Sequence, residues 1–189
     1  GSQFVFNSKG TLLVSSGNYT TTIILWDVTD PAKPKKYDKE LTSESGSSVY
    51  SLSISPDDQI LASAYDDASI RLWELSGDLS DPKTVIKNES LTLKGSSATS
   101  LAFSADSKTL ASGSNQDGAI VLWNVTSYKQ ISEVVKSGSY AVNAVIFGLD
   151  KKTLITGSSD STISFWDISD RRKPSKIGDP LQGHLGQPY

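Results

Sequence analysis

One short apolar motif, seen most clearly in Ser158–Ile168, occurs four times in this 189-residue chain. Each copy is a run of β-branched and aliphatic residues that ends in tryptophan followed by Asp, Glu or Asn. All four tryptophans of the chain lie in this motif, 47, 50 and 43 residues apart: Trp26, Trp73, Trp123 and Trp166. A motif that recurs at a nearly constant interval predicts a chain built from one structural unit used four times.

Two further segments precede each tryptophan motif at fixed places, as Val49–Ile54 and Leu61–Ser63 do in the second copy. All three segments are short, rich in Val, Ile, Leu and Phe, and separated by Asp, Ser, Gly and Pro. This pattern predicts strands joined by tight turns. A fourth, more polar strand is expected after each tryptophan, because an outermost strand is half solvated. These fourth strands are predicted at 36–41, 91–94, 131–135 and 177–181.

The tryptophan strand is apolar on both faces. Since side chains alternate along a strand, Ile163 and Phe165 point one way, and Trp166 and Ile168 the other. Both faces must then be covered, as they are in stacked propeller blades. The sequence therefore predicts an all-β fold: a four-bladed propeller segment with four-stranded antiparallel blades, forming half of a larger or dimeric ring. The blades are expected at about residues 3–43, 48–94, 97–136 and 141–182, and 183–189 would begin a following repeat.

These segments resemble the WD-repeat β-propeller family, and the resemblance covers nearly the whole chain. Its most specific parts are residues 61–74 and 154–167. The linkers that follow Trp26 and Trp166 look like those of bacterial repeat arrays on multidomain signalling proteins. The resemblance implies a non-catalytic protein–protein interaction scaffold, the sensor or adaptor repeat region of a larger protein.

In this family each blade is pinned by four hydrogen-bonded side chains: His, Ser or Thr, Asp, and the tryptophan indole. A buried indole N–H and a buried carboxylate both need partners. The first copy has Thr20 at the Asp position, and the His position holds Ser45, Lys94 and Gly138. We therefore expect weaker pinning or substitute donors. The resemblance places the structural set at Ser15, Trp26, Ser63, Asp67, Trp73, Ser112, Asp117, Trp123, Thr156, Asp160, Trp166 and His184.

The same residues give little support for catalysis. His184 could be a base or a metal ligand, but its Gly-His context favours a structural role. Asp67, Asp117 and Asp160 recur once per repeat, so they do not converge on one atom. The chain has no cysteine, no P-loop, no dinucleotide motif and no nucleophile elbow. We expect no enzyme activity, no metal and no cofactor.

Composition narrows the classes of partner. The net charge is −3, which gives no basic field to gather nucleic acid. Two basic clusters, Lys33–Lys36 and Arg171–Lys173, could contact an anion, but lysines also protect edge strands from further pairing. No apolar run is long enough to span a membrane. The absence of cysteine fits a reducing, cytoplasmic location.

Partners of this family often dock on the rim where the turns between second and third strands meet the starts of the first strands. Tyrosine is enriched among interface hot spots, so two tyrosines on this rim are candidate anchors. The alternative is that the rim residues are merely exposed loop positions. The positions predicted to bind a protein or peptide partner are Tyr19, Tyr50, Asp66, Thr99, Gln116, Asn143 and Ser159.

Four blades are too few for the seven-bladed ring that is usual in this family. The chain opens with Gly1-Ser2 and contains no methionine, so we expect it to be an excised piece of a longer protein. Further blades of the parent chain could complete the ring. Alternatively, two copies could close an eight-bladed propeller as a homodimer. The second possibility gives an alternative function: a structural self-assembly module without a separate ligand.

Overall fold

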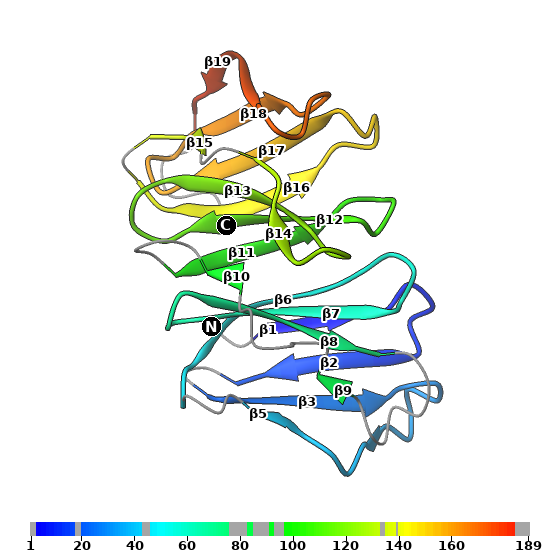
Figure 1. Cartoon of the computed structure of the whole chain (residues 1–189). Helices are drawn as coiled ribbons and strands as arrows, with labels where there is room; N and C mark the ends of the chain where they lie inside the picture. Colours follow the sequence, from blue (N-terminus) through cyan, green and yellow to red (C-terminus); the bar gives the residue numbers. More distant parts are fainter. Residues whose placement is uncertain are drawn as a thin grey trace.

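The computed structural model describes residues 3–17, 20–42, 46–75, 83–84, 91–92, 97–132, 135–138 and 140–183. Figure 1 shows them as four antiparallel sheets stacked face to face in chain order. Every regular element within these residues is a strand. The predicted all-β fold is confirmed, and the four sheets are those of a propeller segment; we call them blades 1 to 4.

Each blade runs from an inner strand through two central strands to an outer edge. Blade 1 contains β1 (Gln3–Phe6), β2 (Leu12–Ser16), β3 (Thr22–Asp27), β4 (Lys35–Lys36) and β5 (Leu41–Thr42). Blade 2 contains β6 (Val49–Ile54), β7 (Ile60–Tyr65), β8 (Ser69–Glu74), β9 (Lys83–Thr84) and β10 (Leu91–Thr92). Blade 3 contains β11 (Ala98–Phe103), β12 (Thr109–Ser114), β13 (Ala119–Asn124), β14 (Lys129–Gln130) and β15 (Val135–Lys136). Blade 4 contains β16 (Val142–Phe147), β17 (Thr153–Ser158), β18 (Ile163–Asp167) and β19 (Ser175–Leu181).

The outer edges differ from the predicted continuous strands. In blade 1, Lys36 pairs with Trp26 and Leu41 with Ile23, so the edge has more residues than its partner strand between the two pairs. The extra residues bulge out and divide the edge into β4 and β5. In blade 3 a side chain replaces the backbone partner where the edge is interrupted between β14 and β15. There the Leu122 amide of β13 donates to the Ser132 hydroxyl at 2.9 Å. In blade 4 the edge is one strand with a register shift.

The turns between the first and second strands repeat the same conformation in every blade. One residue of each turn has a positive φ: Gly10 (66°), Asp58 (60°), Ser107 (58°) and Lys151 (62°). Its amide donates to the carbonyl three residues earlier, over 2.8 to 3.1 Å. Few residues other than glycine adopt this left-handed conformation without strain. Its occurrence at the same position in all four blades shows that the turn has one defined geometry.

Three apolar cores lie between successive blades. In each, the tryptophan-bearing face of one blade packs against the opposite face of the blade before it. Between blades 2 and 3, for example, Trp123 and Leu110 meet Ala62 and Leu72. The inner strands β1, β6, β11 and β16 are neighbours in that order. The stack buries both faces of blades 2 and 3, and only one face of blades 1 and 4.

Candidate functional site

The four tryptophans make the same hydrogen bond in every blade. Each indole Nε1 donates to the hydroxyl of a Ser or Thr on the neighbouring strand. The distances are 2.8 Å for Trp26 to Ser15 and Trp73 to Ser63, 2.9 Å for Trp123 to Ser112, and 3.0 Å for Trp166 to Thr156. In blades 2, 3 and 4 both partners are buried, so without this bond the indole N–H would have neither a water nor a protein acceptor.

The aspartates of the predicted structural set lie in the turns between second and third strands. Asp160 accepts from the Thr162 amide at 3.0 Å and from the Thr162 hydroxyl at 2.6 Å. Asp117 accepts from the Ser114 hydroxyl and the Ala119 amide. These bonds close the turn locally. Among the described residues, no hydrogen bond joins Asp117 to Ser112 or Asp160 to Thr156.

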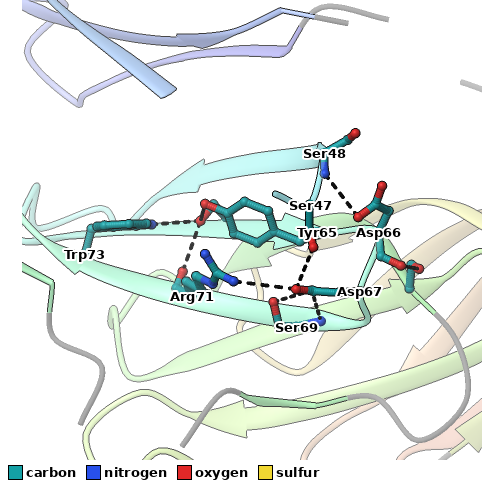
Figure 2. A network of polar contacts seen from close by, with 10 residues as sticks. Ser47, Ser48, Tyr65, Asp66, Asp67, Ser69, Arg71 and Trp73 are labelled. Carbon is teal, nitrogen blue, oxygen red and sulfur yellow. Dashed lines mark hydrogen bonds and ion pairs between the residues drawn. The ribbon is translucent and has the colours of Figure 1, made fainter. Parts of the chain in front are cut away.

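Blade 2 is different, because a chain of side chains spans the distance from tryptophan to aspartate (Figure 2). Ser63, which accepts from Trp73, donates to the Tyr65 hydroxyl at 3.2 Å. The Arg71 guanidinium lies 4.4 Å from the centre of the Tyr65 ring and 3.5 Å from an Asp67 carboxylate oxygen. Tyr65 and Arg71 therefore connect the buried tryptophan pair of this blade to the aspartate of its turn.

Asp67 also ties blade 2 to the loop that precedes it. The Ser47 hydroxyl donates to Asp67 at 2.8 Å, and the Ser69 amide and hydroxyl donate at 3.0 and 2.5 Å (Figure 2). Nearby, the Ser48 amide donates to Asp66 at 3.1 Å. This network orders the rim of blade 2 through side chains that sequence reasoning did not connect.

The network was not predicted, but it left a signal in the sequence. The position of Tyr65 holds Ser114 and Ser158 in blades 3 and 4, while that of Arg71 holds Val121 and Ser164. A large polar residue at both positions in one copy alone breaks the repeat pattern. Since the two positions are diagonal neighbours on one face of adjacent strands, their joint change could have indicated a contact.

The turn carboxylates are held in their charged form. Partial burial raises the pKa of Asp117, but hydrogen bonds from Ser114 and Ala119 and the charge of Lys136 outweigh it, so the pKa is lowered. In Asp160, too, burial is outweighed by hydrogen bonds from Thr162 and Ser158, and the pKa is lowered. With Asp66 and Asp67 on blade 2, this gives the rim a negative potential. Its described cations, Arg71 and Lys136, pair with Asp67 and Asp117.

The predicted partner positions fall into two groups. Asp66 and Gln116 are exposed, and Tyr50 is half-buried on β6. Other positions are engaged within the fold: the Thr99 hydroxyl donates to the Val142 carbonyl at 2.7 Å, and the Ser159 hydroxyl bonds Asn143 at 3.2 Å. Thr99 thereby links blade 3 to blade 4, and its hydroxyl is not free for a partner.

One exposed aromatic residue on this rim was missed. Tyr140 precedes β16, and 57% of its surface is exposed. The carbonyl oxygens of Tyr140 and Gly138 lie against Gly118, where an added Cβ would come within 2.9 and 2.5 Å of them. Gly118 also has a φ of 64°, which glycine adopts without strain. The tyrosine therefore stands on a tightly packed loop.

Some predicted residues lie outside the described part of the chain: Tyr19, His184, and the positions Ser45 and Lys94. Within the described residues, no group of three or more His, Cys, Asp or Glu side chains is placed to hold a metal ion. No helix capable of crossing a membrane occurs in that same part of the chain.

The opposite rim carries bonds between blades. The Ser8 amide and hydroxyl both donate to Asp58 at 2.7 Å, joining the first turns of blades 1 and 2. The Asp57 amide donates to the Ser107 hydroxyl at 3.1 Å, joining those of blades 2 and 3. Arg171, from a basic cluster of the sequence, pairs with Asp106 of blade 3 at 3.2 Å. This arginine therefore serves an internal contact between blades 3 and 4.

Comparison with known proteins gives three matches to one family, described as "WD domain, G-beta repeat", at residues 36–74, 87–124 and 130–167. The first match starts in β4 of blade 1 and ends at the end of β8 in blade 2. The third starts in β14 of blade 3 and ends at the end of β18 in blade 4. A sequence repeat is thus offset from a blade: it takes an outer edge from one sheet and three strands from the next.

Several curated proteins are similar to the chain. "Small ribosomal subunit protein RACK1y" of Oryza sativa subsp. japonica is 33% identical over 121 residues, which are 61% of this chain and 32% of that protein. "Target of rapamycin complex subunit wat1" of Schizosaccharomyces pombe is 26% identical over 170 residues, 87% of this chain and 50% of that protein. "GATOR2 complex protein WDR24" of Dictyostelium discoideum is 38% identical over 64 residues, 32% of this chain and 6% of that protein.

The chain spans half or less of the length of these relatives. They come from eukaryotes, so the bacterial-type likeness of the linkers stays a prediction. Repeats of this kind generally serve as non-catalytic scaffolds for protein interaction. Because the family matches cover more than half of the sequence and follow the observed strands, the chain belongs to the WD40 repeat family.

Proposed function

We propose that this chain is the adaptor or sensor part of a larger protein and binds a protein or peptide partner through the acidic rim described above. The observation that carries the proposal is that this rim has exposed side chains on turns whose backbone is held by hydrogen bonds. Asp66, Gln116 and Tyr140 are exposed. On the same rim, the turn amides of Asp66, Asn115 and Ser159 donate to carbonyls just before the inner strands, at 3.1, 3.0 and 2.9 Å.

A fixed backbone lowers the entropy lost on binding, which favours this rim as a docking surface. Tyr140 and Tyr50 supply aromatic anchors of the kind enriched in hot spots. The aspartates add a negative potential, so we expect a partner with a basic segment and an association rate that falls with salt. The proposal includes no enzyme activity, and a cytoplasmic location stays a prediction.

The test is affinity capture of partners followed by titration of the captured protein against rim variants. We expect Tyr140→Ala or Tyr50→Ala to weaken binding about tenfold or more, the usual scale of a hot-spot truncation. Leu149→Ala is the matched control, because Leu149 is fully exposed on the opposite rim. Unchanged affinity in Tyr140→Ala, Tyr50→Ala and Asp66→Ala would remove this rim as the binding surface.

A second candidate function is self-assembly, in which the blade faces themselves are the interface. It is favoured by large apolar side chains exposed on the outward faces of blades 1 and 4, among them Phe4 and Phe6 at one end and Ile177 and Leu181 at the other. Large contiguous apolar patches on a protein surface mark interaction sites.

A further inference from the structure

An open groove crosses the opposite rim, where turns join the first and second strands of each blade. It has a volume of about 430 Å³ and is formed by blades 2, 3 and 4. Its lining is mainly apolar and includes the last residues of the inner strands and the turn residues that follow them: Ile54, Phe103, Phe147, Pro56, Ala105 and Leu149. Mainly apolar hollows of this size are suited to hold the apolar part of a ligand.

The groove lies at the junctions of blade 2 with blade 3 and of blade 3 with blade 4, both of which are complete in this chain. Its turn residues are equivalent to one another, because Pro56, Ala105 and Leu149 each stand two residues before the positive-φ residue of their turn. Pro56 and Ala105 are exposed although blades 2 and 3 have a neighbour on each side. The full exposure of Leu149 is therefore a property of this turn position and not of the end of the stack.

Cationic side chains adjoin the groove at blades 3 and 4. A smaller hollow shares Ala105, Phe147 and Gly148 with the groove and is also lined by Lys151 and Arg171. The apolar lining of the groove therefore continues directly into a positively charged wall.

This part of the rim has more cations than carboxylates. Residues 104–108, 148–152 and 167–174 include Lys108, Lys151, Lys152, Arg171, Arg172 and Lys173, against Asp106, Asp150, Asp167 and Asp170. Each of these carboxylates accepts a hydrogen bond from the backbone amide two residues later, over 2.8 to 3.1 Å. Within the described residues, Lys108, Lys151 and Lys173 are exposed and make no ion pair. Their ammonium groups give this part of the rim a positive potential.

The blade 2 end of the groove has the opposite charge. Its turn contains Asp57 and Asp58, and Gln59 stands where blades 3 and 4 have Lys108 and Lys152. A ligand in the groove therefore meets an apolar lining along its length and cations at one end. This asymmetry favours one orientation of the ligand.

We propose that this groove is a second docking site, for an extended segment of a partner protein that has acidic residues beside a large apolar side chain. The apolar side chain enters the groove between Pro56, Ala105 and Leu149, and the acidic residues lie over blades 3 and 4. Complementary charge selects an acidic segment and speeds its association. The cations are confined to two blades and the net charge of the chain is −3, so the rim offers no continuous basic track for nucleic acid.

This site goes beyond the function proposed above, because it lies on the other rim and selects the opposite charge. The first experiment selects peptides of about twelve residues from a random phage-displayed library on the whole 189-residue chain at low salt. We expect an enriched class with several Asp or Glu residues next to Leu, Phe or Trp. A synthetic, fluorescently labelled peptide of this class is then titrated by anisotropy, and its affinity should fall as salt is added.

Leu149→Glu should raise the dissociation constant of such a peptide about tenfold or more, because it removes an apolar contact and adds a like charge. Leu149 is fully exposed, so the substitution removes no core packing. Lys151→Gln should raise the constant about twofold to fivefold, the range of an exposed ion pair. Lys33→Gln is the matched control, because it removes an exposed cation of blade 1 and should leave binding unchanged. Gln59→Lys gives blade 2 the lysine of blades 3 and 4 and should tighten binding.

The proposal is overturned if no acidic, apolar class is selected, or if Leu149→Glu binds the peptide as tightly as the unchanged chain. Equal weakening by Lys33→Gln and Lys151→Gln would show attraction to charge in general and would also overturn it. So would Leu149-dependent binding to phosphatidylserine vesicles with no acidic peptide selected, which would assign the groove to a lipid surface.

The two docking proposals can be separated with the same library. Acidic peptides should bind Asp66→Ala and Tyr140→Ala as they bind the unchanged chain, whereas basic peptides should be weakened by these variants and not by Leu149→Glu. Selection of basic peptides alone would overturn the groove and leave the acidic rim as the docking surface.

Discussion

Asp67 of blade 2 and Asp117 of blade 3 hold the same place in the repeat, yet they are connected in different ways. Both accept bonds that close their own turn. Only Asp67 is linked onward, through Arg71 and Tyr65, towards the buried tryptophan pair of its blade. The difference shows that the turn and the tryptophan pair are two separable devices, and that a blade folds whether or not they are joined.

The largest expected effect tests the device that both blades share. Trp73→Ala and Trp123→Ala should each lower the free energy of unfolding by about 3–5 kcal/mol, because each leaves a cavity between two blades and an unpaired hydroxyl. Urea unfolding followed by circular dichroism measures the change. A cost below about 1 kcal/mol in either blade would show that its tryptophan is not part of the stabilising core.

The next effect tests the turn itself. Gly118→Ala in blade 3 should cost about 2–3 kcal/mol, because the added methyl group meets the Gly138 carbonyl oxygen and the left-handed φ disfavours it. The equivalent position in blade 2 is Ala68, with a φ of 66°. Ala68→Gly should therefore stabilise the chain by up to about 1 kcal/mol. The two stability changes need not be equal in size. A Gly118→Ala variant with unchanged stability would contradict the packing at this turn.

A smaller effect isolates the link from Asp67 through Arg71 to Tyr65, which within the described residues is seen in blade 2. Arg71→Met should cost about 1–2 kcal/mol by removing the stack on the buried Tyr65 ring and the partly exposed ion pair with Asp67. Val121→Met at the matching position of blade 3 is the control for steric change. A double-mutant cycle of Arg71→Met with Tyr65→Phe should show coupling; strict additivity would mean that the two side chains do not act together.

The smallest effect concerns pH. Asp117 has a lowered pKa in the folded chain, so its contribution is fully present above its unfolded pKa of about 4 and is lost as the pH falls through the folded value. Since the side chain is partly solvated, that contribution should stay below about 1 kcal/mol. Asp117→Asn should lower stability at pH 7 and flatten the loss in acid. An unchanged slope between pH 5 and 2 would contradict the charged form as the stabilising one.

Much of the fold could be predicted because its signals are local. The inner three strands of each blade follow alternating apolar runs and turn residues that stand a few positions apart in sequence. The outer edges could not be placed as well, since the bulges beside Lys36 and Ser132 depend on how an edge strand meets its neighbour and not on its own pattern.

The same distinction between local signals and contacts with distant segments applies to the candidate site. The tryptophan and serine positions follow from the repeat, because each blade reproduces them. The Arg71 link, the Asp58 bond to Ser8 and the engagement of Thr99 with blade 4 are contacts between segments far apart in the chain. Exposure of Tyr140 likewise depends on how its loop packs against Gly118. A single sequence gives no measure of such distances.

The offset between sequence repeat and blade has a consequence for how such arrays change during evolution and in engineering. A gene duplication that copies one repeat, such as residues 130–167, inserts the outer edge of one sheet together with the inner strands of another. The strands of the inserted copy therefore pair within two neighbouring sheets, so an array can lengthen without adding a sheet that is separate from the rest. Cutting an array at the same boundary has the reverse effect: it strips the last sheet of its edge strand and exposes backbone that will pair with whatever strand it next encounters.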